Sequence, residues 1–202
     1  DGGTWAAYSD ATNVVADTDN YVQGGGSIKF DLTGSATTAG ISNTSVTTFD
    51  IAKYRDNGSV FVWVYVNSTT NLTNFILDIG NDLTTNYFTR TITTASDGVA
   101  FKNGWNLLRF DFVDMTLNGT GTSATCDSIR LYMTKTSGKS DDGYRVDDMT
   151  MHTGQYFDII FYSKYIWQSS AGTYIENSTS STDKLNVDTD EIDILVAKGK
   201  AE

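Results

Sequence analysis

The stretch Val60-Phe61-Val62-Trp63-Val64-Tyr65-Val66 decides the fold, because it is the longest run of β-forming residues in the chain. Successive side chains of a strand point to opposite faces. Valine therefore occupies one face of the predicted strand and aromatic rings occupy the other. Since both faces are apolar, we expect a central strand of a β-sandwich, covered by a second layer or by a loop.

Shorter segments of the same kind surround this strand in the sequence. Ile28, Phe30 and Leu32 alternate with polar residues, which is the pattern of a half-buried strand. Further strands are expected within residues 1–8, 14–17, 46–51, 74–79, 86–92, 105–112, 128–133 and 144–151. Short strands broken by Gly, Asn and Asp, with no amphipathic helix before about residue 188, predict an all-β antiparallel sandwich over residues 1–154.

The character of the sequence changes after Gly154. Residues 157–168 are expected to form a strand with exposed aromatic side chains, and the small polar residues 169–186 an extended arm. From Asp188 a short helix is predicted, because acidic residues favour a helix N-terminus and the apolar residues that follow share one helical face. We therefore interpret residues 155–202 as a separate segment that serves assembly.

Composition excludes several classes of function. The formal net charge of −11 argues against nucleic acid as a partner, since binding to a phosphate backbone depends on clustered Lys and Arg. No apolar run approaches the roughly 18 to 20 residues that cross a bilayer, so no membrane partner is expected. The single cysteine, Cys126, permits no internal disulfide, and the single histidine, His152, is expected to be an ordinary strand residue near a sheet edge.

No motif supports catalysis. The carboxylate pairs Asp141-Asp142 and Asp147-Asp148 are adjacent in sequence, so on a strand they point to opposite faces and cannot flank one glycosidic bond. The chain has no G-x-S-x-G turn, and Cys126 has only His152 as a base, with no pattern that brings the two together. The run Gly24-Gly25-Gly26 precedes a strand and lacks the lysine of a phosphate-binding loop. A non-enzymatic protein is therefore expected.

Three stretches resemble the jelly-roll carbohydrate-binding modules that have a galactose-binding-like sandwich. They are Gly25-Gly26-Ser27-Ile28-Lys29-Phe30-Asp31, Asn103-Gly104-Trp105-Asn106-Leu107-Leu108-Arg109-Phe110-Asp111 and Tyr144-Arg145-Val146-Asp147-Asp148-Met149, in the order and spacing of those modules. The resemblance covers residues 1–153. It implies a jelly-roll sandwich in which Trp105 is a core residue.

Glycan binding by such a module would need exposed aromatic rings, with nearby polar groups for the sugar hydroxyls. Trp63 and Tyr65 share a strand face, and Tyr87, Phe88 and Arg90 lie on a strand that follows a short turn. These five residues are the candidate glycan-binding residues. The alternative is that their rings are ordinary core material.

The sequence also offers ligands for a structural calcium ion, because hard cations prefer carboxylate and carbonyl oxygens. The resemblance implies that calcium ties the loop after the first strand to the last strand. The ligands would be a carboxylate of Asp147 or Asp148 and carbonyl oxygens near Gly25 and Ser27. The alternative is that the two carboxylates are solvated or bonded to turn amides.

Residues 161–168, 176–179 and 188–191 resemble the segment that follows such a module in tailed-phage virion proteins of the neck and connector type. In those proteins an extended arm and an acidic D-x-D element lead into a helix, and Ile166 here replaces the proline of the arm. The resemblance implies a virion protein that assembles with copies of itself and with other virion proteins, and that attaches to surface polysaccharide. Two alternatives stay open, both outside the cell: a secreted carbohydrate-binding module or adhesin domain, and a filament subunit.

Overall fold

The chain divides into two compact units, Asp1–Gln155 and Tyr156–Glu202. The predicted boundary between residues 154 and 155 lies beside this division. The computed structural model describes residues 4–136, 138–153, 167–168, 174–175 and 184–185.

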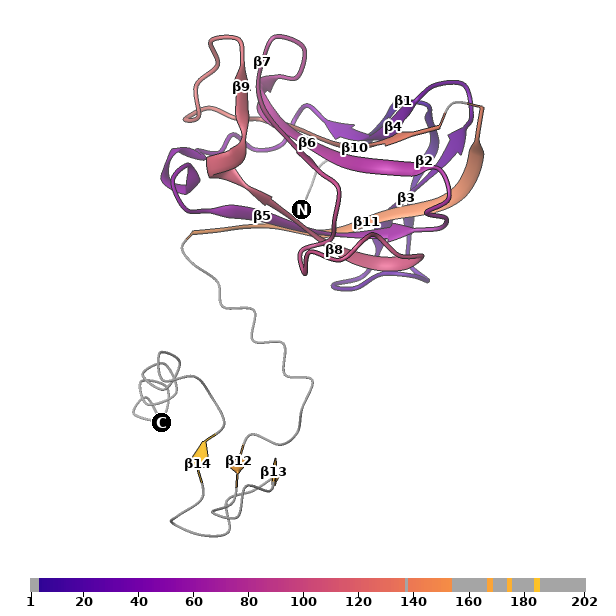
Figure 1. Ribbon diagram of the computed structural model, residues 1–202. Coiled ribbons are helices and arrows are strands. Elements are labelled where there is room, and N and C mark those ends of the chain that lie inside the picture. The colour runs from indigo at the N-terminus through magenta and orange to yellow at the C-terminus, as the bar shows by residue number, and fades with distance from the viewer. Residues whose placement is uncertain (1–3, 137, 154–166, 169–173, 176–183, 186–202) are drawn as a thin grey trace. The chain divides into compact units, whose positions relative to one another are not determined.

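The first unit is a sandwich of two antiparallel sheets, which Figure 1 shows as two layers. One sheet has five strands, in the order β2 (Ala11–Asp17), β3 (Ser27–Thr33), β11 (Ser140–His152), β5 (Ser59–Val66) and β8 (Gly104–Asp111). The other has six, in the order β1 (Ala6–Ser9), β4 (Thr38–Asn43), β10 (Ser128–Lys135), β6 (Leu72–Asp82), β7 (Asn86–Ile92) and β9 (Thr116–Asn118). The chain crosses repeatedly between the sheets, and the predicted all-β jelly roll is confirmed.

The helices of the described residues are short 3₁₀ turns at Ala52–Tyr54 and Phe112–Asp114. Neither turn has the length or the hydrophobicity of a segment that crosses a membrane. Strands and loops supply most of the described core, and Phe112 in the second turn also belongs to it.

The valine face of β5 lies at the centre of the core. All four valines of the strand have an exposed fraction of 0%, and β5 pairs with β11 on one side and β8 on the other. The prediction of a central strand is therefore confirmed. Its aromatic face differs from the expectation: within the described residues no second layer covers it, and Phe61, Trp63 and Tyr65 are partly exposed on the outside of the five-stranded sheet.

In the first unit, one predicted strand is wrong and two strands, β4 and β9, were missed. Residues 46–51 form no strand, and Phe49 makes only an isolated bridge with Cys126. The strand in this part of the chain is β4, which precedes residues 46–51 and pairs with β1 and β10. The sequence of β4, Thr-Ala-Gly-Ile-Ser-Asn, has weak β propensity, so pairing on both sides decides its conformation.

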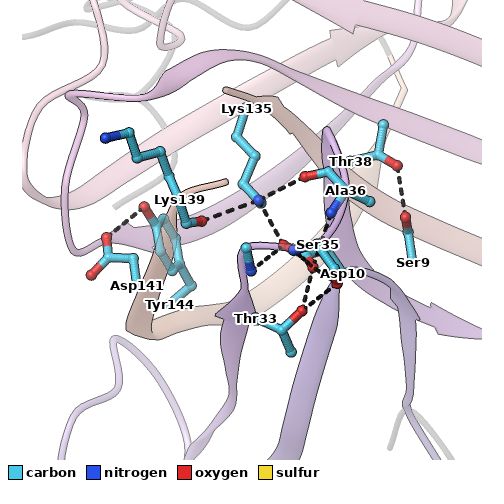
Figure 2. Close-up of polar contacts among 11 residues, drawn as sticks. Ser9, Asp10, Thr33, Ser35, Ala36, Thr38, Lys135, Lys139, Asp141 and Tyr144 are labelled. Carbon is cyan, nitrogen blue, oxygen red and sulfur yellow. Dashed lines mark hydrogen bonds and ion pairs between the residues drawn. The ribbon is translucent and has the colours of Figure 1, made fainter. Parts of the chain in front are cut away.

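A buried ion pair ties the two sheets together at one end (Figure 2). Lys135 Nζ on β10 lies 2.6 Å from Asp10 Oδ2, between β1 and β2, with side chains that are 2% and 0% exposed. Asp10 also accepts hydrogen bonds from the Thr33 hydroxyl, from the Ser35 hydroxyl and from the amides of Gly34, Ser35 and Ala36. One carboxylate thereby holds the β3–β4 loop against β10.

In the second unit, β12 (Trp167–Gln168) pairs with β13 (Tyr174–Ile175) and with β14 (Lys184–Leu185) in an antiparallel sheet. Parts of the predicted arm are therefore paired strands. The predicted strand over residues 157–168 is described only at its last two residues, and the helix predicted from Asp188 lies outside the described residues.

Candidate functional site

The outer face of the five-stranded sheet carries a row of aromatic side chains. On β5 the valines point into the core, so Phe61, Trp63 and Tyr65 point outward. On β8 the buried Leu108 marks the inward side, and Trp105 lies on the opposite side and is half-buried. Tyr65 and Trp105 are partners in the β5–β8 register, so the row crosses two neighbouring strands.

Contacts with neighbouring residues hold one end of this row in place. The rings of Tyr65 and Trp105 meet edge-on, with centroids 5.5 Å apart. The guanidinium carbon of Arg145 lies 5.0 Å from the centre of the Tyr65 ring. The indole N–H of Trp105 donates to Asn20 Oδ1 at 3.0 Å. These rings are therefore preorganised, and a ligand that stacks on them would not have to order them.

Trp63 occupies the middle of the row. Phe61, next to it on the same face, packs edge-on against His152 with ring centroids 5.7 Å apart. The cross-strand partners of Trp63 are Asp147 on β11 and Leu107 on β8. Within the described residues, the Trp63 side chain forms no ring pair, cation–π contact or hydrogen bond. Within the described part of the row, the Trp63 ring is therefore the one that a ligand could contact without displacing an aromatic or polar neighbour.

The loop between β2 and β3, residues 18–26, borders this face. An ion pair at its start joins Arg145 Nε to Asp17 Oδ2 at 2.6 Å, with side chains 16% and 11% exposed. Hydrogen bonds from the Asp19 amide and from Arg145 hold the pKa of Asp17 below its usual value. Tyr21 in the same loop is 43% exposed. The loop therefore has a defined anchor and adds an exposed ring to the border of the face.

The remaining predicted glycan-binding residues lie on the other sheet. Phe88 on β7 points into the core, is 4% exposed, and has the Arg55 guanidinium 4.2 Å above its ring centre. Arg90 forms an ion pair with Asp114 at 2.9 Å. Tyr87 is on the outer face of the six-stranded sheet. The structure thus brings Trp63 and Tyr65 together and separates them from the other three.

Asp147, a predicted calcium ligand, is bonded to backbone amides. Its Oδ2 accepts from the amides of Val22 and Gln23 at 2.6 and 3.0 Å, and its Oδ1 accepts from the Asp148 amide at 2.8 Å. A cation would meet the positive ends of these N–H dipoles. The alternative reading of the sequence, a carboxylate bonded to turn amides, describes Asp147 in this structure.

The other predicted calcium ligands do not complete a cation site. The Ser27 hydroxyl donates to the Asn20 carbonyl at 2.7 Å, and Gly25 is exposed. Asp148 sits in a bulge of β11 with φ of 44°. Among the residues that the structure describes, no three His, Cys, Asp or Glu side chains cluster as metal ligands would. The arrangement does not fit the predicted ligand set, and calcium binding stays a prediction.

A cavity of about 570 Å³ lies between the sheets beside Asp147 and Asp148. Most of its lining comes from aliphatic and methionine side chains of both sheets, such as Val60, Ile79 and Met151. Ser27, Asp147 and Asp148 add polar groups to this lining, and Trp5 is its one aromatic residue. The cavity therefore lacks the row of aromatic rings that the outer face of the five-stranded sheet offers to a sugar.

The thiol and the imidazole that the sequence offers for nucleophilic chemistry have other surroundings. Cys126 is fully buried, burial raises its pKa to about 11, and its Sγ contacts the carbonyl oxygens of Thr122 and Ser123. His152 packs on Phe61, and its Nε2 lies 3.0 Å from the Thr150 hydroxyl. A thiol with a raised pKa and a carbonyl environment is not an activated nucleophile.

Sequence reasoning missed three residues of the aromatic face: Trp105, Arg145 and Asn20. The resemblance implied that Trp105 is a core residue, whereas it is half-buried on the outer face. The sequence did contain a sign of this, because Trp105 and Arg109 are four residues apart and so lie on the same face of the strand. An arginine on that face indicates that the face points to solvent. Asn20 and Arg145 carry no such signal, since their contacts span 85 and 128 residues of sequence.

Comparisons with known proteins bear on the fold. No protein-family model and no curated protein matches the chain. Among solved structures, it is similar to the family 30 carbohydrate-binding module of a cellulosomal cellulase from Clostridium thermocellum. That match has a TM-score of 0.52 and 12% identity, and covers 73% of this chain and 88% of that chain.

A second solved structure similar to this chain is an exo-β-agarase. The match has a TM-score of 0.51 and 12% identity, and covers 81% of this chain and 25% of that enzyme. At this level of identity a structural likeness shows the fold alone. The chain therefore has the jelly-roll sandwich fold of carbohydrate-binding modules.

Proposed function

We propose that this protein binds polysaccharide without cleaving it, through the outer face of the five-stranded sheet. Trp63 is the principal stacking ring, and Tyr65 and Trp105 extend the platform across β5 and β8. The observation that carries the proposal is the contrast within the row: the rings of Tyr65 and Trp105 are held by neighbours, while the Trp63 ring between fixed groups makes no ring pair or hydrogen bond in the described part of the chain.

The physical argument concerns the two kinds of surface that a sugar offers. The C–H face of a pyranose packs on an aromatic ring, and the hydroxyls around its edge need hydrogen-bond partners. Here the rings lie beside polar groups from neighbouring strands and from the β2–β3 loop, including Arg145 and Asn20. A preformed platform of this kind suits a chain of sugar units better than a compact apolar molecule.

The fold supports this proposal. One similar solved structure is a carbohydrate-binding module, and another is an exo-β-agarase of which this chain spans a quarter. We propose that the protein acts outside the cell, where polysaccharides of this kind are found.

The test is a binding titration against a panel of soluble polysaccharides, by affinity electrophoresis and calorimetry. Wild-type protein is expected to bind at least one of them, and Trp63→Ala to weaken that binding by about 30-fold, equivalent to about 2 kcal/mol for a central aromatic contact. Tyr87→Ala, on the opposite sheet, is the matched control and is expected to bind as the wild type does. Equal loss in both variants, or no loss in Trp63→Ala, would contradict the proposal.

The virion and filament hypotheses depend on residues 155–202. Of these, the structure describes only the three short paired strands, and nothing in the structure or the comparisons indicates a virion protein. Both hypotheses stay predictions from sequence. Deleting residues 156–202 and measuring the mass of the particles in solution tests them, because either assembly role requires the full chain to associate and the first unit alone to stay monomeric.

A further inference from the structure

The β2–β3 loop and strand β11 are joined at the place where the resemblance to carbohydrate-binding modules implies a calcium ion. We propose that the Asp147 carboxylate takes over this task and acts as a positioning residue, holding the loop as one wall of the glycan platform without a cation. This inference rests on the proposed function, because the wall matters only if the aromatic face binds sugar.

The first support is the set of donors around Asp147. Val22 and Gln23 donate their amides to one carboxylate oxygen at 2.6 and 3.0 Å, and Asp148 donates its amide to the other at 2.8 Å. Hydrogen bonds to an ionised carboxylate are stronger than neutral ones. Both carboxylate oxygens therefore accept hydrogen bonds from N–H groups. A calcium ion binds oxygen ligands, and the N–H groups already occupy the positions around this carboxylate where the ion would lie.

The second support is the place of Asp147 in the sheet. Its cross-strand partner in the β11–β5 register is Trp63, whose ring makes no ring pair, cation–π contact or hydrogen bond within the described residues. The residue that holds the loop is thus next to the residue that is proposed to stack on the sugar. A shift of the loop away from β11 would open the platform at its central ring.

The third support is that the other anchors of the loop lead to the same platform. The Ser27 hydroxyl donates to the Asn20 carbonyl at 2.7 Å, and the Asn20 side chain accepts from the indole of Trp105 at 3.0 Å. Arg145, which lies over the Tyr65 ring, pairs with Asp17 at the loop's start. Each of these contacts joins protein atoms directly, so the loop has its supports without an ion.

Asp148 provides the matched control. It has the same charge as Asp147 and is the next residue, and it joins the Asp147 interaction through its backbone amide rather than its side chain. Its φ of 44° is a conformation that asparagine adopts readily, so Asp148→Asn should preserve the bulge. Asp147→Asn, in contrast, removes the charge and replaces one of the two accepting oxygens with an NH₂ group, so either the amides of Val22 and Gln23 or the amide of Asp148 loses its acceptor.

The experiment combines three measurements on the full chain. First, Asp147→Asn is expected to weaken binding to the best polysaccharide of the panel by about tenfold, the loss of a hydrogen-bonded charged group, while Asp148→Asn binds as the wild type does. Second, the amide proton resonances of Val22 and Gln23 are expected to move in Asp147→Asn and to stay in place in Asp148→Asn. Third, millimolar Ca²⁺ or a chelator is expected to change neither these resonances nor the melting temperature of the wild type.

Calcium that raises the melting temperature and moves the Val22 and Gln23 resonances would overturn the inference in favour of a cation site. Wild-type affinity in a folded Asp147→Asn variant would overturn the positioning role. A wild type that binds no polysaccharide would overturn the proposed function and with it this role, while the resonances and the calcium titration would still decide whether a carboxylate or an ion holds the loop.

Discussion

The two outer faces of the sandwich both carry aromatic rings, yet the rings have different surroundings. On the six-stranded sheet, the guanidinium of Arg130 lies 4.5, 5.3 and 5.7 Å from the ring centres of Tyr8, Tyr132 and Tyr87. Tyr8 and Tyr132 also meet edge-on, 5.1 Å apart. On the five-stranded sheet, Trp63 lies between its neighbours without such a partner within the described residues.

Two glycines explain the first of these faces. Gly40 is the register partner of both Tyr8 and Tyr132, and Gly80 is the partner of Tyr87. A Cβ at Gly40 would lie 2.6 Å from the Tyr132 Cβ, so the absence of a side chain makes room for the aromatic residue beside it. The tyrosines cover bare backbone and pack on one arginine. An exposed ring without aromatic or polar neighbours is therefore a candidate for ligand binding. A ring that packs on a neighbouring arginine and on glycine backbone has a structural role.

The largest effect is expected on the tyrosine face. Arg130 pairs with Asp78 at 2.6 Å, and the Asp78 side chain is 0% exposed. Arg130→Ala leaves that charge buried without its partner, and we expect a loss of about 3–5 kcal/mol in the free energy of unfolding. Urea denaturation followed by tryptophan fluorescence measures it. Arg109→Ala is the control, since its pair with Asp111 is 39% and 33% exposed and such pairs contribute less than about 1 kcal/mol. Equal losses in the two variants would contradict the comparison.

A smaller effect is expected when a methyl group is added under the tyrosines. In Gly40→Ala the new Cβ would lie 2.2 Å from the Leu131 carbonyl oxygen and 2.4 Å from the Tyr132 Cα. These are backbone atoms that cannot move alone, so we expect a loss of about 2–3 kcal/mol, typical of overpacking. Gly25→Ala has no atom within 4 Å of the new Cβ and should stay within about 0.5 kcal/mol of the wild type. A neutral Gly40→Ala would show that the rings are not fitted to the glycine.

Polysaccharide binding by one variant from each face tests the difference between the two faces directly. Tyr65→Ala removes a ring that borders Trp105 and is expected to weaken polysaccharide binding by about tenfold, or about 1.4 kcal/mol. Tyr8→Ala removes a ring of the other face and should leave the affinity unchanged, although it loses contact with Tyr132. Calorimetric titration of both variants measures these outcomes. A drop in affinity with Tyr8→Ala would mean that the tyrosine face binds as well.

The smallest effect concerns pH. The pKa of Asp17 is lowered from 3.8 by hydrogen bonds from the Asp19 amide and from Arg145. A lowered pKa means that the folded protein gains from the ionised carboxylate above about pH 4 and loses this gain as the pH falls through the lowered value. Protonation of Asp17 would also weaken its ion pair with Arg145, which anchors the β2–β3 loop beside the aromatic face. Polysaccharide affinity should therefore be constant from about pH 7 to pH 5 and decline below about pH 4. Affinity that already declines between pH 7 and pH 5 would contradict this prediction.

Much of the fold follows from side-chain alternation, and most of the site does not. The alternation in residues 60–66 and 28–33 is sufficient to place strands and to separate their two sides, because a strand alternates whatever its partners are. The same reasoning treated Tyr87 and Phe88 as a pair, although adjacent residues on a strand face opposite ways. The structure shows the consequence: Phe88 is in the core and Tyr87 is outside.

Contacts between distant residues account for what sequence reasoning missed. Asp147 accepts hydrogen bonds from the amides of Val22 and Gln23, which are 125 and 124 residues away in the sequence. Neither the residue types nor their spacing predicts these hydrogen bonds. Strand β4 was missed for a related reason, since Gly40 and its neighbours are weak β formers that are held between two strands from elsewhere in the chain.

By itself, the sequence determined that the first 150 or so residues form antiparallel strands, one of them apolar on both faces, because the period of apolar residues is a local property of the chain. It also determined that Trp63 and Tyr65 share a side of one strand. Only the tertiary structure decided which side faces the second sheet and which rings complete their contacts there. Those outcomes depend on side chains that are far apart in sequence and meet only when the two sheets pack.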